Sequence, residues 1–500
     1  MNMNLSKSLQ DNINTVNELL PLNKSFDLVT RRMKLCRLDS YFIGINGYCD
    51  SKVLNTLLKD LHGMDFSTLL AETDSSSAIL NSLMSAVPVA QIEYQNNWDS
   101  LLKSLLSGTL LIFFEGVDQG FTIDIRQYPV RSIDEPQNEK VIRGAKDGFV
   151  ETLLFNANLI RRRIRSPQLT FEALSVGSIS KTDVAIAYMK DKADSELLNS
   201  IRTHIQAMDV AALTMGTRSM EELLVPHKWY HPLPALFRTE RPDVACSYLL
   251  EGYILLMVDT TPSVLVLPCS IFQFTQSPED YYKSPLIGNY IRFYRFLCSI
   301  VSLFLLPLFL LFAIHPELLP GGFSLQQQEY ISPLQLCIYV FFAEIALDLF
   351  RYSSSHSPEG FSGALAIVGG LLIGDTAVTM QWASREIIFY AAATVLASLS
   401  ISSIEFSEAI RMYRFLLLFC TGAGGLIGSA SNISLFGIPA GLAGFLIGCV
   451  LVGLSIVTTP AAFGKSYFWP LIPFNRNALR ALLFRYPAKY KQPPQIWRQK

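Results

Sequence analysis

The sequence predicts an α/β region of two small domains, followed by an all-α polytopic transmembrane domain of about six helices. Half of the 500 residues are hydrophobic and the mean hydropathy is +0.30, which is high for a soluble protein. Up to about residue 286, charges alternate with short apolar runs, whereas residues 296–460 hold few charges and several long apolar runs. The second part therefore suits a bilayer, because a spanning helix needs about 20 mostly apolar residues.

Changes of composition divide the chain into five segments. The polar residues 1–24 are expected to form a flexible lead-in. Two cytoplasmic α/β domains are expected over residues 25–150 and 151–290. A transmembrane helical domain follows over residues 291–464, and a basic cytoplasmic tail over residues 465–500.

Strand and helix patterns alternate within both α/β domains. The first domain shows, in order, a strand, a turn at Gly44 and Gly47 and a helix within residues 31–63, a helix near 98–106, and a hairpin over 109–129. The second shows a strand over 182–189, a helix over 194–208, and strands over 253–258 and 264–267. This alternation favours a mixed sheet backed by helices, and no internal repeat is evident.

A highly charged bridge, residues 130–165, joins the two α/β domains and ends in Arg-Arg-Arg-Ile-Arg. Such a run is typical of a solvated helix face between domains. The alternative is that Arg161, Arg162, Arg163 and Arg165 meet acidic lipid headgroups or a neighbouring subunit.

Six stretches are candidate membrane spans: 296–314, 334–350, 361–380, 387–404, 415–433 and 437–459. Arg292 and Arg295 stand before the first span, and the loop after that span has no Lys or Arg. Positive-inside bias therefore places the N-terminal region in the cytoplasm. Because the tail is also basic, both termini are expected in the cytoplasm, which requires an even number of spans.

Three acids in these spans are candidate pore or selectivity residues: Asp375 in the third span, and Glu344 and Asp348, spaced i, i+4, in the second. A carboxylate at the centre of a membrane helix costs roughly 2.5–3.5 kcal/mol, so such residues usually face a bundle interior or a water-filled path. Rings of carboxylates attract cations. The alternative is that these are buried structural acids, with Asp348 paired to Arg351. Asp375 lies towards the outer end of its span, which favours a role in selectivity over a proton relay.

Glycines at GxxxG spacing predict close helix packing, within one subunit or between subunits. The pairs are Gly370 with Gly374, Gly437 with Gly441, and Gly444 with Gly448.

No enzyme chemistry is indicated, because GxGxxG, GxxxxGK[ST], GxSxG and HExxH motifs are all absent from the sequence. No metal site or cofactor is expected. The net charge of −1 gives no reason to expect nucleic acid as a partner. Glu240, Arg241 and Asp243 are expected to form a structural charge cluster that fixes a turn before the strand near Tyr253.

Several segments resemble a known family. RTERPDVACSYLLEGYILLMVDTTPSVLVLP (238–268), SPEDYY (277–282) and the arginine-containing approach to the first span resemble the GerA spore germination family, the A subunits of nutrient germinant receptors. Segments over 139–165, 180–191, 306–320 and 469–475 are similar to a narrower branch of that family, and the similarity runs from about residue 26 to residue 487.

The resemblance implies a two-part cytoplasmic N-terminal region, a multispan C-terminal region, and residence in the inner membrane of bacterial endospores. Family A subunits resemble ring-forming channels that release monovalent cations when germination starts. Members usually carry Gln where this chain has Asp375. That departure would raise cation preference or mark a different arrangement of partners.

The sequence therefore leaves two alternative functions. The first is a homo-oligomeric cation channel subunit, in which Glu344 and Asp375 tune permeation. Its partners would be membrane lipid, monovalent cations, other germination proteins and, as an optional component, an accessory membrane protein. The second is a non-conducting membrane scaffold that docks other germination proteins through its cytoplasmic domains.

Overall fold

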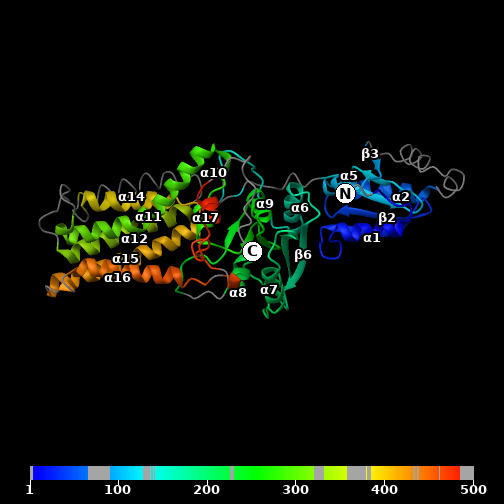
Figure 1. Ribbon diagram of the computed structural model, residues 1–500. Coiled ribbons are helices and arrows are strands. Elements are labelled where there is room, and N and C mark those ends of the chain that lie inside the picture. The colour runs from blue at the N-terminus through cyan, green and yellow to red at the C-terminus, as the bar shows by residue number, and fades with distance from the viewer. Residues whose placement is uncertain are drawn as a thin grey trace.

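The chain forms two α/β domains and a helical domain arranged in a row (Figure 1). This computed structural model describes residues 4–65, 91–127, 136, 139, 141–225, 230–319, 332–356, 379, 384–431, 434–435, 438–460, 462–464 and 466–484. Four residues singled out in the sequence lie outside this range: Gly370, Gly374, Asp375 and Gly437.

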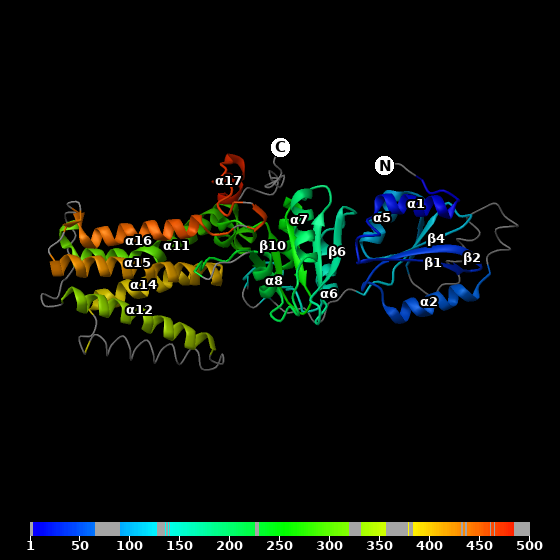
Figure 2. The same cartoon turned by 90° about the horizontal axis from the view of Figure 1, so that it is seen from below.

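The first α/β domain is an antiparallel sheet with helices on both faces (Figure 2). Its strand order is β1 (Leu28–Leu35), β2 (Leu38–Ile45), β4 (Leu110–Phe114), β5 (Gly120–Ile123) and β3 (Ile92–Gln95). Helices α1 (Leu9–Leu19) and α5 (Trp98–Leu106) share one apolar cluster with the sheet, and α2 (Ser51–Gly63) shares another. Strand β4 is buried throughout, because its alternate side chains enter the two clusters.

The predicted helix over 98–106 and the predicted β4–β5 hairpin are confirmed. The single strand expected before Gly44 is instead a hairpin, β1–β2, whose turn residues Cys36 and Arg37 both have positive φ. A Cys-Arg pair is not among the residues that usually signal such a turn, so the sequence concealed it.

The lead-in, expected to be flexible, contains α1. Ser8 caps this helix, and Leu9, Ile13 and Val16 pack in one apolar cluster with the sheet. Polar residues fill the positions between them and mask the i, i+4, i+7 pattern.

The second α/β domain repeats the topology of the first. Its strand order is β6 (Leu169–Val176), β7 (Thr182–Met189), β9 (Ile254–Val258), β10 (Val264–Leu267) and β8 (Phe237–Thr239). Helices α6 (Leu153–Arg163), α7 (Ser195–Gln206), α8 (Thr217–Leu224) and α9 (Pro242–Glu251) accompany it. In both domains a helix precedes a hairpin at one edge of the sheet. The strand at the other edge, β3 or β8, is the third of the five in chain order. All strand pairs of the described residues are antiparallel, in place of the mixed sheet expected.

A buried ion pair joins the two α/β domains. Arg161 of α6 donates from Nε to Asp27 Oδ2 at 2.7 Å, and both side chains are fully shielded from solvent. The other guanidinium nitrogens donate to the backbone carbonyls of Ser166 and Leu169, each at 2.9 Å. Arg161 thus has acceptors from both domains, which decides against the solvent-exposed and lipid-facing alternatives for this one arginine.

The chain before β1 also pairs with the edge of the second sheet. Phe26 N donates to Phe171 O at 3.1 Å, and Phe171 N donates to Ser25 Oγ at 3.0 Å. The edge of β6 is therefore covered by a segment of the first domain, which protects an edge strand from other pairing.

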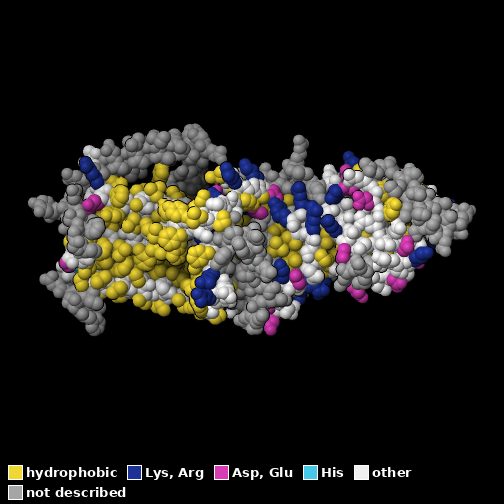
Figure 3. Space-filling model, turned by 45° about the horizontal axis from the view of Figure 1, so that its top comes forward, with side chains coloured by type: hydrophobic (Ala, Val, Ile, Leu, Met, Phe, Trp, Pro, Cys, Tyr) yellow, Lys and Arg dark blue, Asp and Glu magenta, His cyan; other side chains and the backbone are white. Residues whose placement is uncertain are grey.

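The helical domain contains α11 (Pro285–Ile314), α12 (Pro333–His356), α14 (Arg385–Leu399), α15 (Ile404–Ser431) and α16 (Ala440–Val457). Four of these helices, α11, α12, α15 and α16, are long and apolar enough to cross a membrane. Their surface forms a broad apolar area (Figure 3). Of the other two predicted spans, 387–404 corresponds to α14, which has 15 residues, and 361–380 falls almost wholly outside the described residues.

The second domain and the helical domain share one apolar core. Phe274 of the second domain stacks on Phe406 of α15 with ring centroids 5.7 Å apart. Tyr467, which follows α16, donates its hydroxyl to Pro234 O at 3.0 Å. Arg295 of α11 donates to Asp280 at 3.0 Å, and Arg292 lies 3.4 Å from the same buried carboxylate. The arginines expected to mark the membrane edge therefore also fix the start of α11.

Replacing Asp27 by Asn tests the ion pair between the α/β domains. The substitution leaves Arg161 charged and buried, and breaking such a pair costs about 3–5 kcal/mol. We expect a lower midpoint of thermal unfolding of the full chain in detergent, followed by circular dichroism. The control is Asp65→Asn, which removes the partner of the exposed Arg37 and should cost less than about 1 kcal/mol. Equal midpoints for the two variants would contradict the role of Arg161.

Candidate functional site

A buried ion pair joins helices α12 and α15 of the helical domain. Arg414 of α15 donates from Nε to Glu344 Oε1 of α12 at 2.8 Å, and its Nη2 also contacts this oxygen. Its Nη1 donates to the Ser302 carbonyl of α11 at 2.8 Å and to the Ser302 hydroxyl at 3.0 Å. Both charged side chains are fully buried. One guanidinium thus connects three helices.

A second pair lies one helical turn away. Arg411 of α15 donates to Asp348 Oδ1 of α12 at 3.0 Å, with both side chains 22% exposed. Arg411 is a partner of this acid that the sequence alone does not indicate. The predicted spans 387–404 and 415–433 leave Arg411 and Arg414 between them, whereas α15 begins at Ile404 and includes both arginines. The i, i+3 spacing of the arginines, opposite acids spaced i, i+4, is the sequence signal that was available.

The two pairs form a charge-balanced layer between α12 and α15, the charge layer (Glu344, Asp348, Arg411 and Arg414). Each carboxylate already accepts a hydrogen bond from an arginine, which favours the structural interpretation of these two acids. Glu344 Oε2 is buried and accepts no hydrogen bond from the described part of the chain. Asp375 and the glycines 370 and 374 lie outside the described residues, so their roles remain predictions.

Glycines bring α15 and α16 into backbone contact. A Cβ atom placed on Gly444 would lie 2.3 Å from Cys420 O, and one on Gly424 would lie 2.4 Å from Ala440 O. A Cβ on Gly448 would lie 3.2 Å from Cys420 Cβ, and one on Gly441 would lie 2.6 Å from the His315 ring. Any larger side chain at Gly444 would therefore separate the two helices.

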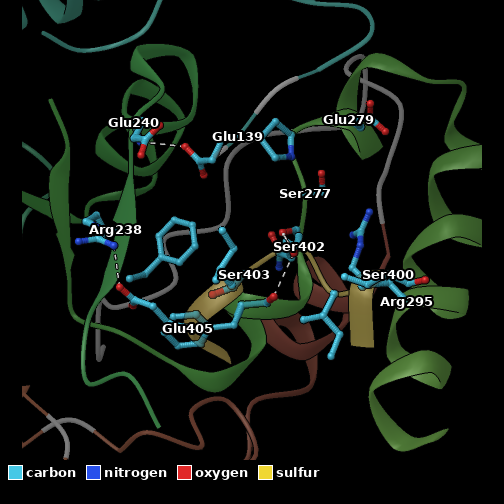
Figure 4. Close-up of a pocket in the computed structure, with 17 residues that line it drawn as sticks. Glu139, Arg238, Glu240, Ser277, Glu279, Arg295, Ser400, Ser402, Ser403 and Glu405 are labelled. Atoms are coloured by element: carbon cyan, nitrogen blue, oxygen red, sulfur yellow. Dashed lines mark hydrogen bonds and ion pairs between the residues drawn. The ribbon is translucent and has the colours of Figure 1, made fainter. Parts of the chain in front are cut away.

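A cavity of about 550 Å³ lies where the second α/β domain meets the helical domain (Figure 4). Its charged lining residues are Glu139, Glu240, Glu279, Glu405, Arg238 and Arg295. Arg238 of β8 pairs with Glu405 of α15 at 2.7 Å, and the Ser402 hydroxyl donates to Gln276 O at 2.9 Å. The cavity wall is thus made of contacts between the two domains. Its residues come from segments far apart in the sequence, so no local motif indicated it.

Glu139 is a cavity acid whose pKa departs from its usual value. Burial raises its pKa to about 7, although the carboxylate accepts hydrogen bonds from the Thr239 hydroxyl at 2.7 Å and from Glu240 N at 2.8 Å. This carboxyl therefore changes charge near neutral pH.

The predicted charge cluster begins a helix. Arg241 donates to both carboxylate oxygens of Asp243, at 3.1 and 2.8 Å, and to the backbone carbonyls of Glu139 and Ala145. The Glu240 side chain lines the cavity. The turn expected before the strand near Tyr253 is replaced by α9, with Pro242 in its first turn. Arg241 therefore fastens the bridge between the α/β domains onto α9.

Arg414→Met tests the charge layer. The variant leaves Glu344 buried without its cation, and removing one partner of a buried pair costs about 3–5 kcal/mol. We expect a clear fall in the midpoint of thermal unfolding in detergent. Glu344→Met/Arg414→Met should lose less stability than the sum of the single variants, because no unpaired charge remains. The control is Glu18→Gln, at an exposed position of α1 outside the helical domain. Additive losses in the double variant would contradict the pairing.

Gly444→Val tests the α15–α16 contact, with Gly453→Val on the same helix as a matched control. A Cβ on Gly453 meets no atom within 4 Å, whereas one on Gly444 meets the Cys420 carbonyl. Overpacking typically costs 1–3 kcal/mol, so we expect roughly that loss for Gly444→Val alone. The measurement is thermal unfolding of both variants in the same detergent. Equal effects would show that the helices do not depend on this approach.

Comparison with known proteins identifies relatives along almost the whole chain. The family model described as Bacillus/Clostridium GerA spore germination protein matches residues 16–495. Stage V sporulation protein AF of Bacillus subtilis (strain 168) is 31% identical over 465 residues, which cover 93% of this chain and 90% of the relative. Spore germination protein A1 of the same organism is 27% identical, over 97% of this chain and 95% of the relative.

A solved structure is also similar to the N-terminal part of the chain. It is the crystal structure of the N-terminal domain of the A subunit of the Bacillus megaterium spore germinant receptor GerK3. The two are 25% identical with a TM-score of 0.41, over 53% of this chain and 96% of that one. The family match over residues 16–495, together with the similarity to stage V sporulation protein AF, shows that this chain belongs to the GerA spore germination family.

Proposed function

We propose that this chain is a subunit of a homo-oligomeric channel that releases monovalent cations during spore germination. The observation that supports the proposal is the charge layer, which places four ionisable side chains within apolar helices. Ionisable residues inside membrane helices commonly mark ion pathways or the elements that shape them. Membership of a germination family gives the process in which the channel would act.

The charge layer and Asp375 would have different tasks. Glu344 and Asp348 are paired with arginines, so they hold α12 against its neighbours and offer little free negative charge. Asp375 would supply the negative charge that favours cations, at the outer mouth of a pore formed between copies. The sequence predicted that Glu344 tunes permeation, whereas in this proposal Glu344 supports the structure of the pore.

The proposed location is the spore inner membrane, with both termini cytoplasmic. The α/β domains and the segment after α16 lie at the same end of the helical bundle (Figure 2). That placement requires an even number of crossings, which suits the positive-inside argument.

A scaffold without conduction is the second candidate. Its support is the firm attachment of the α/β region to the helical domain through Arg238–Glu405 and the Phe274–Phe406 stack. A rigid two-domain region of this kind offers a large platform for docking other germination proteins.

Flux from proteoliposomes separates the two functions. The full chain is reconstituted in vesicles loaded with potassium, and efflux and cation-over-anion selectivity are measured for Asp375→Asn, Glu344→Gln and the exposed control Glu18→Gln. Loss of one charge at a pore mouth is worth about 1 kcal/mol, so we expect roughly five-fold lower selectivity for Asp375→Asn. Glu344→Gln should lower the thermal stability instead.

Two outcomes would count against the channel. Unchanged conductance and selectivity in Asp375→Asn would remove the proposed role of that acid. A wild-type protein that is monomeric within a complex of germination proteins, and that gives no flux, would favour the scaffold.

A further inference from the structure

We infer that residues 466–484 form an interfacial anchor that binds anionic lipid headgroups on the membrane face next to the α/β domains. The first observation is the charge of the C-terminal part of the chain. From residue 465 to residue 500 there is no Asp or Glu, although the whole chain carries a net charge of −1. The basic residues of this part are Lys465, Arg476, Arg480, Arg485, Lys489, Lys491, Arg498 and Lys500.

The base of the anchor is fixed to the second α/β domain. Tyr467 and Trp469 are buried in the core that this domain shares with the helical bundle. Ile271 N donates to Tyr467 O at 3.0 Å, and Tyr467 donates its hydroxyl to Pro234 O. The segment therefore leaves the bundle in a defined direction.

The tip of the anchor is ordered and yet exposes apolar side chains. Leu471, Ile472 and Phe474 are 42%, 61% and 68% exposed. Asn475 N donates to Pro470 O at 2.8 Å, and the Asn475 side chain accepts from Ala478 N to cap α17 (Arg476–Leu483). Because hydrogen bonds hold the loop in this shape, the exposure of these apolar side chains belongs to the folded structure.

The anchor continues the apolar surface of the membrane helices. It follows α16, whose last turns expose Leu454 and Val457, by 56% and 64%. Helix α17 projects beside the end of the bundle that joins the second α/β domain (Figure 2). The first turns of α11, at the same end, expose Tyr290 and Phe293, and aromatic residues of this kind gather at membrane–water boundaries.

Exposed apolar side chains next to arginines, in a segment that has no acidic residue, are typical of an element that lies in the interface of a bilayer. The apolar tip would enter the boundary of the acyl chains, while Arg476 and Arg480 stay at the level of the headgroups. Each basic residue near an anionic surface strengthens binding about five-fold. Charge complementarity therefore selects anionic phospholipid as the occupant of this surface.

Protection from trypsin in vesicles tests the anchor in the full-length protein. The chain is reconstituted in phosphatidylcholine alone, or with added phosphatidylglycerol. Cleavage after Arg476 and Arg480 is followed by mass spectrometry and divided by cleavage after Arg143, an exposed arginine of the α/β region. We expect this ratio to fall at least about five-fold with phosphatidylglycerol and to recover in high salt.

Two variants make the outcome specific. Ile472→Ser/Phe474→Ser should return the ratio in phosphatidylglycerol to the value in phosphatidylcholine, with an unchanged elution volume as the check of folding. Ile179→Ser, at another exposed apolar position 80% accessible to solvent, should leave the protection intact. Equal ratios in the two kinds of vesicle would overturn the proposal, because protection that does not depend on anionic lipid cannot come from its headgroups. Cover by a second copy or by another protein would give this result.

Discussion

Buried guanidinium groups fix how the parts of this chain meet. A guanidinium has five N–H donors and remains charged, so it can be buried only where several acceptors converge. Arg161, Arg241 and Arg414 are the three largest fully buried side chains in the described part of the chain. Each binds one carboxylate and at least one backbone carbonyl. The acceptors come from separate elements, and the arginine can be satisfied only when those elements are assembled.

These arginines lie at successive junctions along the molecule. Arg161 joins the first α/β domain to the second, Arg241 fastens the bridge onto α9, and Arg414 joins three membrane helices. Lysine could not replace them without loss, because a single ammonium group does not match the planar arrangement of acceptors. Polar contacts therefore specify how these elements meet, while apolar clusters provide the bulk of the stability, including the core that the second α/β domain shares with the helical domain.

Local patterns in the sequence located many elements but not their partners. Strands 182–189 and 264–267 were predicted with the bounds that the structure has, because their apolar runs end at clear turn signals. The run Arg-Arg-Arg-Ile-Arg could not show that Arg161 is buried while Arg162 is exposed, since its carboxylate partner is 134 residues away. Helix α9 was missed although Pro242 stands in its first turn and Gly252 ends it with φ of 100°. The repeated topology of the two α/β domains was also concealed, because the same order of elements is built from different side chains.

The contact between α15 and α16 limits where the helical domain can change shape. At Gly424 and Gly444 the two backbones touch, and no layer of side chains lies between them that could adopt other rotamers. The two helices must then move as one rigid hairpin. Helix α12, in contrast, meets α15 through long side chains, among them those of the charge layer and the stacked rings of Phe341 and Phe415. Any opening of the bundle would therefore take place on the α12 side. Helix α12 would move relative to the α15–α16 hairpin, which would stay fixed.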